Sequence, residues 1–155
     1  MNKAISLLLV VGGVWSEVEA KKLEERVRER LIAKVYTEAV MDYISAKFSI
    51  PKNELVVVYE PRIAHGLSPD LVLVHNDVWF VIEFKTRPSL MRDVEQLARY
   101  MKAIEEYVRP KRVIPIMAYV YNKPGMPLDK YVHGIKPIVI LLLRGGTYHV
   151  LYENL

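Results

Sequence analysis

The stretch PDLVLVHNDVWFVIEFK (residues 69–85) consists of two apolar segments joined by a two-residue turn, Asn76-Asp77. A turn of this length and composition predicts a tight antiparallel hairpin. If pairing continues outward from the turn in register, Asp70 lies opposite Glu83. The sequence therefore predicts two facing carboxylates near the open end of the hairpin.

This opposed pair predicts a bound cation. Directly opposed like charges destabilise a sheet by a few tenths to about 1 kcal/mol, so we expect a cation between Asp70 and Glu83. Lys85 lies two residues beyond Glu83, on the same face of its strand. The chain has no cysteine, which excludes disulfides, Cys-ligated zinc and iron–sulfur clusters. A hard cation with oxygen ligands, Mg²⁺ or Mn²⁺, is expected instead.

The chemistry that these residues favour is hydrolysis of a phosphate ester. Asp70, Glu83 and the backbone carbonyl of Phe84 would bind the divalent ion, which would act as a Lewis acid. Lys85 would position or help to deprotonate a water molecule near that ion and would stabilise charge developing on the phosphate during in-line attack. The alternative interpretation is a surface ion-pair cluster of Asp70, Glu83 and Lys85 on a sheet edge.

Composition sets the class of protein. The 155 residues are 52% hydrophobic and 26% charged, which predicts one globular domain over residues 1–155 with a sizeable core. A net charge of +4 and a pI of about 9.2 suit a polyanionic partner such as DNA. Charged residues are plentiful and glutamine occurs once, at Gln96, a composition compatible with a thermophile.

The apolar run from Ala4 to Trp15 is interpreted as a buried strand rather than a signal peptide. Gly12-Gly13 interrupts it, and it is shorter than the ~20 residues that span a bilayer. We therefore expect a soluble cytoplasmic protein with no membrane partner.

A long helix is predicted from Ser16 to about Phe48, because Ser16 and Glu19 have the spacing of a capping box. Its inward stripe contains one charged position, Glu25, which lies one heptad before Ile32. Glu25 is therefore a candidate functional acid; the alternatives are a solvated residue in the charged stretch 21–30, or Glu38 as the helix acid. The apolar members of the stripe are Ile32, Tyr36, Ala39 and Tyr43.

The remaining segments alternate between strand and helix signals and predict an α/β domain with a mixed sheet. A second helix, from Pro88-Ser89 to about Val108, carries an apolar stripe of Leu90, Val94, Leu97, Met101, Ile104 and Val108. Strands are predicted at about 54–63, 70–75, 78–86 and 113–121, with a loop at 124–127 and a closing hairpin of 138–143 and 148–152 on Gly145-Gly146.

These motifs resemble the PD-(D/E)xK nuclease superfamily, whose fold is the restriction-endonuclease-like core. Pro69-Asp70 resembles the PD element and Glu83-Phe84-Lys85 the ExK element, and Glu25 occupies the place of the acidic residue on the first core helix. The predicted order, α-β-β-β-α-β, is also the family's, so the resemblance covers roughly residues 16–121. It implies a divalent-metal-dependent nuclease acting on DNA, with Glu25 among the metal ligands and catalytic residues.

A further element, Gln96-Leu-Ala-Arg-Tyr100, looks like the QxxxY motif of RecB-type nucleases. By this resemblance, Gln96 and Tyr100 support catalysis. Gln96 would orient water or bind phosphate, and Tyr100 would stack or donate a hydrogen bond. Arg92 and Arg99 on the same helix would pair with the DNA backbone. The alternative is a solvated helix flank. Because the chain has no cysteine and no histidine before His65, a nuclease dependent on an iron–sulfur cluster is not expected.

Several alternatives remain open. His65, in the loop before Asp70, would contact DNA or simply be solvated. The segment Ser68-Pro69-Asp70-Leu71 is also similar to one found in Holliday junction resolvases of the same core. A non-catalytic DNA- or protein-binding module and a structural protein are further interpretations. Specificity would come from DNA structure, a homodimer partner or another protein.

Overall fold

A six-stranded mixed sheet forms the centre of the computed structural model, which describes residues 16–125 and 134–153. The strand order is β1-β2-β3-β4-β5-β6; the β3–β4 and β4–β5 pairs are parallel and the others antiparallel. The predicted α/β class with a mixed sheet is confirmed. The elements are α2 (Glu17–Phe48), η1 (Lys52–Glu54), β1 (Val56–Tyr59), β2 (Leu71–His75), β3 (Val78–Lys85), α3 (Leu90–Tyr107), β4 (Arg112–Val120), β5 (Ile138–Leu142) and β6 (Tyr148–Tyr152).

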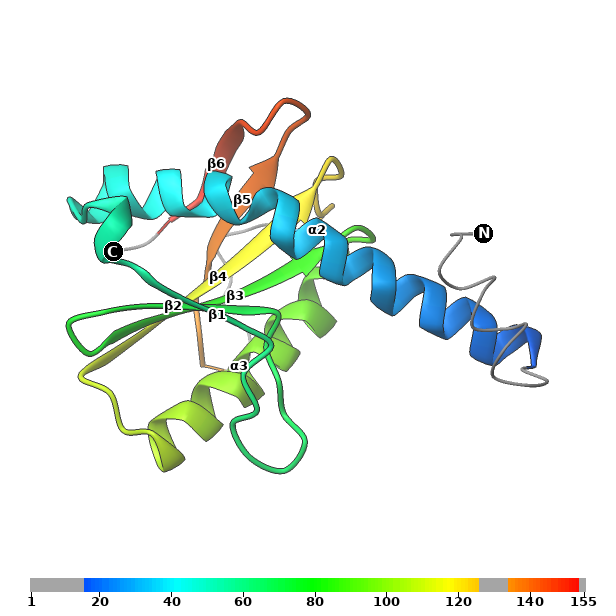
Figure 1. Cartoon of the computed structure of the whole chain (residues 1–155), viewed down its shortest axis with the longest axis horizontal. Helices are drawn as coiled ribbons and strands as arrows, with labels where there is room; N and C mark the ends of the chain where they lie inside the picture. Colours follow the sequence, from blue (N-terminus) through cyan, green and yellow to red (C-terminus); the bar gives the residue numbers. More distant parts are fainter. Residues whose placement is uncertain (1–15, 126–133, 154–155) are drawn as a thin grey trace.

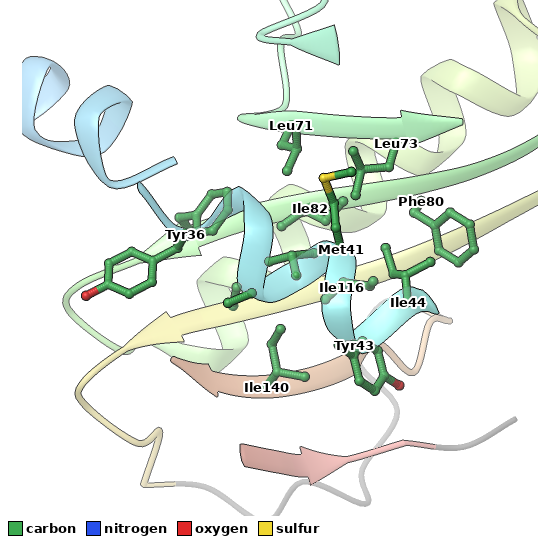
Figure 2. Packing of buried hydrophobic residues seen from close by; sticks show 14 of the residues in the cluster. Tyr36, Met41, Tyr43, Ile44, Leu71, Leu73, Phe80, Ile82, Ile116 and Ile140 are labelled. Atoms are coloured by element: carbon green, nitrogen blue, oxygen red, sulfur yellow. The ribbon is translucent and has the colours of Figure 1, made fainter. Parts of the chain in front are cut away.

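Helices α2 and α3 cover opposite faces of this sheet (Figure 1). Side chains alternate between the faces along each strand. In β3, Phe80 and Ile82 therefore pack toward α2, where Figure 2 shows the larger of two hydrophobic clusters, whereas Val81 packs toward α3. The same alternation puts Glu83 and Lys85 on the α3 face.

The hairpin register is as predicted. Asn76 and Asp77 have φ angles of 45° and 62°, the left-handed pair that a two-residue turn requires. β2 and β3 pair from His75 with Val78 to Leu71 with Ile82. One further step brings Asp70 opposite Glu83, at the end of the hairpin away from the turn.

Helix α2 begins with the predicted capping box. The Ser16 hydroxyl accepts a hydrogen bond from the Glu19 N–H at 3.1 Å, and the Ser16 N–H donates to the Glu19 carboxylate at 3.4 Å. Burial against the sheet starts only at Ala33. The first half of α2 accordingly projects past the sheet, beyond the end of β3 (Figure 1).

The structure corrects the predicted first strand. The span 54–63 divides into η1 and the four-residue edge strand β1, because Glu60 adopts a positive φ of 46° and Pro61 follows it without an N–H for the ladder. The predicted strand over 4–15 and the end of the predicted 124–127 loop lie outside the described residues.

The apolar face of α3 is also rotated slightly from the predicted stripe. Tyr100 and Ala103 are buried, whereas Val108 is exposed. Tyr100 belongs to the cluster between α3 and the sheet, so it does not lie on an open flank of the helix. No helix within residues 16–125 and 134–153 has the length and apolar character needed to cross a membrane.

Candidate active site

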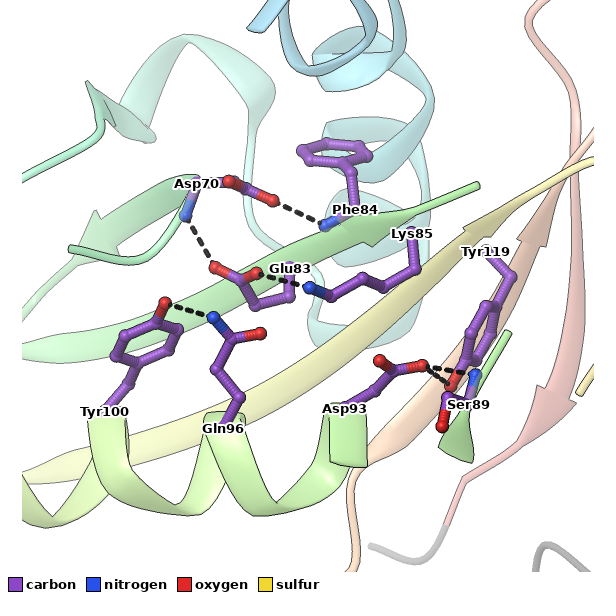
Figure 3. Close-up of polar contacts among 9 residues, drawn as sticks. All are labelled: Asp70, Glu83, Phe84, Lys85, Ser89, Asp93, Gln96, Tyr100 and Tyr119. Atoms are coloured by element: carbon purple, nitrogen blue, oxygen red, sulfur yellow. Dashed lines mark hydrogen bonds and ion pairs between the residues drawn. The ribbon is translucent and has the colours of Figure 1, made fainter. Parts of the chain in front are cut away.

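Two crossed hydrogen bonds fix the facing carboxylates at the end of the hairpin (Figure 3). The Asp70 backbone N–H donates to Glu83 Oε1 at 2.8 Å, and the Phe84 N–H donates to Asp70 Oδ2 at 2.9 Å. Glu83 is only 3% exposed. The strand backbone therefore holds both carboxylates in fixed positions, side by side.

Burial disfavours the charged form of both acids. It raises the pKa of Asp70, although the Phe84 N–H and Lys85 oppose the rise. Burial and then the charge of Asp70 raise the pKa of Glu83 well above its ordinary value. Two carboxylates in one buried place repel each other when both are ionised, so protons or a cation must compensate them.

Lys85 supplies part of that compensation. Its ammonium Nζ lies 3.7 Å from Glu83 Oε2, and its side chain is 21% exposed, so the group also reaches solvent. The structure thus brings together the three residues that the hairpin register predicted: Asp70, Glu83 and Lys85.

Gln96 and Tyr100 face this group from α3 (Figure 3). The Gln96 Nε2 donates to the Tyr100 hydroxyl at 2.8 Å. Burial, with the charges of Glu83 and Asp70, raises the pKa of Tyr100, so its hydroxyl stays protonated. Because Tyr100 is only 5% exposed, its ring has no open face for a base, and its hydroxyl instead fixes the position of the Gln96 amide.

A cavity of about 420 Å³ opens between α2, the end of β3 and the start of α3. It places the predicted DNA-contacting residues Arg92 and Arg99 beside Lys85. Its lining residues are Glu25, Lys85, Thr86, Arg87, Ser89, Arg92, Asp93, Gln96 and Arg99.

Glu25 reaches this cavity, but the structure does not place it in a metal-binding cluster. Within the described part of the chain, no three His, Cys, Asp or Glu side chains are close enough together to hold a metal ion. The first half of α2 projects beyond the sheet, which separates Glu25 from Asp70 and Glu83. Glu38, the alternative helix acid, pairs with Lys52 at 2.6 Å and does not line this cavity.

The structure places His65 outside the cavity. The His65 Nε2 shares a 2.7 Å hydrogen bond with the hydroxyl of Tyr107, at the C-terminal end of α3, and the two rings contact edge to face. Arg92 and Gln96 lie in the N-terminal half of that helix. The loop that carries His65 lines a separate hollow with Arg62 and Ser68.

Sequence reasoning missed a buried carboxylate beside the site, Asp93. Only 6% of Asp93 is exposed; its Oδ2 accepts the Tyr119 hydroxyl at 2.8 Å and the Ser89 N–H at 3.0 Å (Figure 3). Tyr119 is the β4 neighbour of Lys85. The signal that could have revealed Asp93 is an acid among the apolar positions of α3, three residues before Gln96.

Glu60 was missed as well. It lines a cavity of about 180 Å³ with Asp70, and its charge adds to the rise in the pKa of Asp70. The Arg30 Nε donates to the Glu60 carboxylate at 3.0 Å. Glu60 is therefore an acid near the site whose charge is largely engaged by α2.

Replacing Tyr119 with phenylalanine is expected to lower the free energy of unfolding by about 1–3 kcal/mol, because the buried Asp93 carboxylate loses a hydrogen-bond donor. Equilibrium urea unfolding measures this. Tyr107→Phe, which removes an exposed hydroxyl bond to His65, is the matched control and should have little effect. Equal losses for the two variants would contradict the importance of the bond between Tyr119 and Asp93.

No protein-family model and no curated protein matches this chain. Among solved structures, a protein of unknown function from Silicibacter pomeroyi is similar at 15% identity and a TM-score of 0.43. The alignment covers 75% of this chain, which spans 66% of the length of the other.

Proposed function

We propose that this protein is a divalent-metal-dependent nuclease that hydrolyses phosphodiester bonds in DNA. The observation that carries the proposal is the pair of opposed carboxylates, Asp70 and Glu83, next to the ammonium group of Lys85. Burying two like charges is costly unless something compensates them. A site of this kind is better suited to chemistry than to stability.

The donor set fits a hard divalent cation. Carboxylate and carbonyl oxygens are the ligands that Mg²⁺ and Mn²⁺ prefer. Asp70, Glu83 and the backbone carbonyl of Phe84 would hold the ion. Glu25 lines the adjoining cavity but, in the described part of the chain, does not form a three-residue cluster with the two acids. When bound, the ion would neutralise negative charge on the phosphate as a Lewis acid.

The chain's own residues would do the rest. Lys85 is close enough to Glu83 to hold a water molecule beside the carboxylates and to stabilise the negative charge that develops on the phosphate. Gln96 is held by Tyr100, so its amide oxygen can accept a hydrogen bond from that water. Arg92 and Arg99 line the same cavity and would pair with the substrate's backbone.

The element order supports the finer assignment to a restriction-endonuclease-like core. The chain runs α2, β1, β2, β3, α3, β4, which is the α-β-β-β-α-β order of the PD-(D/E)xK nucleases that the sequence resembles. A C-terminal hairpin of β5 and β6 extends the sheet beyond this core.

Cleavage of labelled DNA tests the proposal directly. Wild-type protein is incubated with single-stranded, duplex, flap and four-way-junction DNA in the presence of Mg²⁺, Mn²⁺ or EDTA. We expect products with either metal and none with EDTA, because the phosphate charge needs a cation. Asp70→Asn should lose the activity, whereas Glu106→Gln, a carboxylate change on the exposed side of α3, should keep it.

The substrate panel also separates the alternatives. Cleavage confined to four-way junctions by a two-fold dimer would indicate a resolvase. Salt-dependent DNA binding without cleavage under any metal condition would indicate a non-catalytic binding module. Activity in EDTA, or at the wild-type rate in Asp70→Asn, would contradict the metal-dependent assignment.

A further inference from the structure

We propose that the substrate is double-stranded DNA, and that the phosphate backbone of one strand lies in a groove between the first half of α2 and the start of α3. This inference rests on the proposed nuclease function and names its substrate class. The shape of the groove, its charge and the chemistry of its side chains support this inference.

The groove consists of two adjoining cavities. The cavity beside Lys85 and a second one of about 340 Å³ share three lining residues, Glu25, Thr86 and Arg87. Because the cavities share walls, they form one continuous depression that starts beside the carboxylates and follows α2 outward. The second cavity is lined by Lys21, Glu24, Glu25, Arg28, Thr86 and Arg87.

Positive charge predominates along this depression. Its cationic side chains are Lys21, Arg28, Lys85, Arg87, Arg92 and Arg99, and its acidic ones are Glu24, Glu25 and Asp93. Glu24 and Arg28 pair with each other at 3.5 Å, which leaves five cations in the depression against Glu25 and Asp93. The excess of cations suits an extended polyanion such as a phosphate backbone.

Cationic side chains also lie on the opposite side of the carboxylates. Lys34 and Arg30 of α2 line the cavity that reaches Asp70 from the β1 side. Arg30 is paired with Glu60 of the same cavity at 3.0 Å, so Lys34 is the cation that this side offers to a phosphate. A backbone held by Lys34 and by the groove would therefore pass Asp70 and Lys85, where cleavage is proposed.

The described part of the groove offers no aromatic surface for stacking bases. Among residues 16–125 and 134–153, none that lines its two cavities is aromatic, and Tyr100 is buried. Proteins that bind single strands combine a cationic groove with aromatic platforms for the bases, whereas sequence-independent binding of a duplex depends on contacts to its phosphates. Tyr59, beside Asp70 in the neighbouring cavity, has its hydroxyl bonded to Thr37 at 3.0 Å and provides the alternative to test.

Fluorescence anisotropy in EDTA, where cleavage does not interfere, tests this inference. A short labelled duplex and its single strand are titrated at several salt concentrations with wild-type protein, the groove variant Lys21→Ala/Arg87→Ala and the stacking variant Tyr59→Ala. The matched control is Lys111→Ala/Arg112→Ala, two exposed cations at the start of β4, where it pairs with the opposite end of β3 from Lys85.

Wild-type protein is expected to bind the duplex about tenfold more tightly than the single strand at equal salt. The groove variant should reduce the slope of log affinity against log salt by about 2, because each removed cation leaves one phosphate without its partner. The control and Tyr59→Ala should retain the wild-type slope and affinity.

Three results would overturn the inference. The first is tighter binding of the single strand than of the duplex. The others are a larger loss of affinity in Tyr59→Ala than in the groove variant, and equal affinity of the groove variant and the control. Absence of binding to either DNA would overturn it too. Failure of the nuclease proposal has a different signature, in which the duplex is bound through the groove but is not cleaved when Mg²⁺ is added.

Discussion

Replacing Lys85 with alanine is expected to slow cleavage of the best DNA substrate by about 10²–10⁴-fold, the range for loss of a positioned acid–base or charge-stabilising group. The ammonium lies 3.7 Å from Glu83 Oε2 and lines the cavity that contains Arg92 and Gln96. Within the described part of the chain, no other lysine lines that cavity. Because the side chain belongs to neither hydrophobic cluster, the fold should survive the change.

Single-turnover cleavage with Mg²⁺ measures this effect, and thermal unfolding verifies that the variant is folded. Lys111→Ala, at the opposite end of the sheet, is the matched control and should cleave at the wild-type rate. Lys85→Arg separates two roles: it keeps the positive charge but cannot accept a proton, since the guanidinium stays charged in proteins. Rescue by arginine would indicate charge stabilisation, and full activity in Lys85→Ala would remove Lys85 from the mechanism.

The central part of the candidate site could be predicted because it is local. A two-residue turn and the two-residue period of a strand together fix which residues face each other. Asp70 and Glu83 are only 13 positions apart in the sequence, so only one turn and two short strands had to be placed correctly. The start of helix α2 could be predicted for the same reason, since its capping box involves residues only three positions apart.

The interactions that sequence reasoning missed are those that depend on tertiary packing. Tyr119 and Asp93 are 26 positions apart and meet only because α3 packs across β4. Glu25 was predicted by extending the helical stripe toward the N-terminus of α2. That half of the helix does not pack on the sheet, because burial begins only at Ala33. Periodicity alone could not show that Glu25 stays apart from Asp70 and Glu83. Likewise, burial of Tyr100 depends on the rotation of α3 against the sheet.

Replacing Glu83 with glutamine is expected to stabilise the metal-free protein at neutral and alkaline pH by about 1–3 kcal/mol, the scale found when buried charges are replaced by uncharged side chains. The pKa of Glu83 is raised by burial and by Asp70. The folded state therefore binds more protons than the unfolded state between the ordinary pKa of 4.5 and the raised value. Stability contributed by the protonated acid is present at low pH and is lost as pH rises through this window.

Thermal unfolding of both proteins in EDTA, from about pH 5 to about pH 8, measures this dependence. The midpoint of Glu83→Gln should exceed that of wild type at the alkaline end, by about 2–4 °C per kcal/mol, and the difference should narrow as pH falls. Glu106→Gln should follow wild type throughout. Mg²⁺ should raise the midpoint of wild type more than that of Glu83→Gln, because only wild type has both carboxylates.

The two interpretations of the acid pair predict opposite signs in this experiment. If Glu83 were kept as the partner of Lys85 in a stabilising ion pair, its loss would lower the midpoint, most strongly at alkaline pH, where the carboxylate is charged. If the pair is kept for catalysis, Glu83→Gln should be both more stable without metal and unable to cleave DNA. That combination is expected where a fold retains a destabilising arrangement for its chemistry.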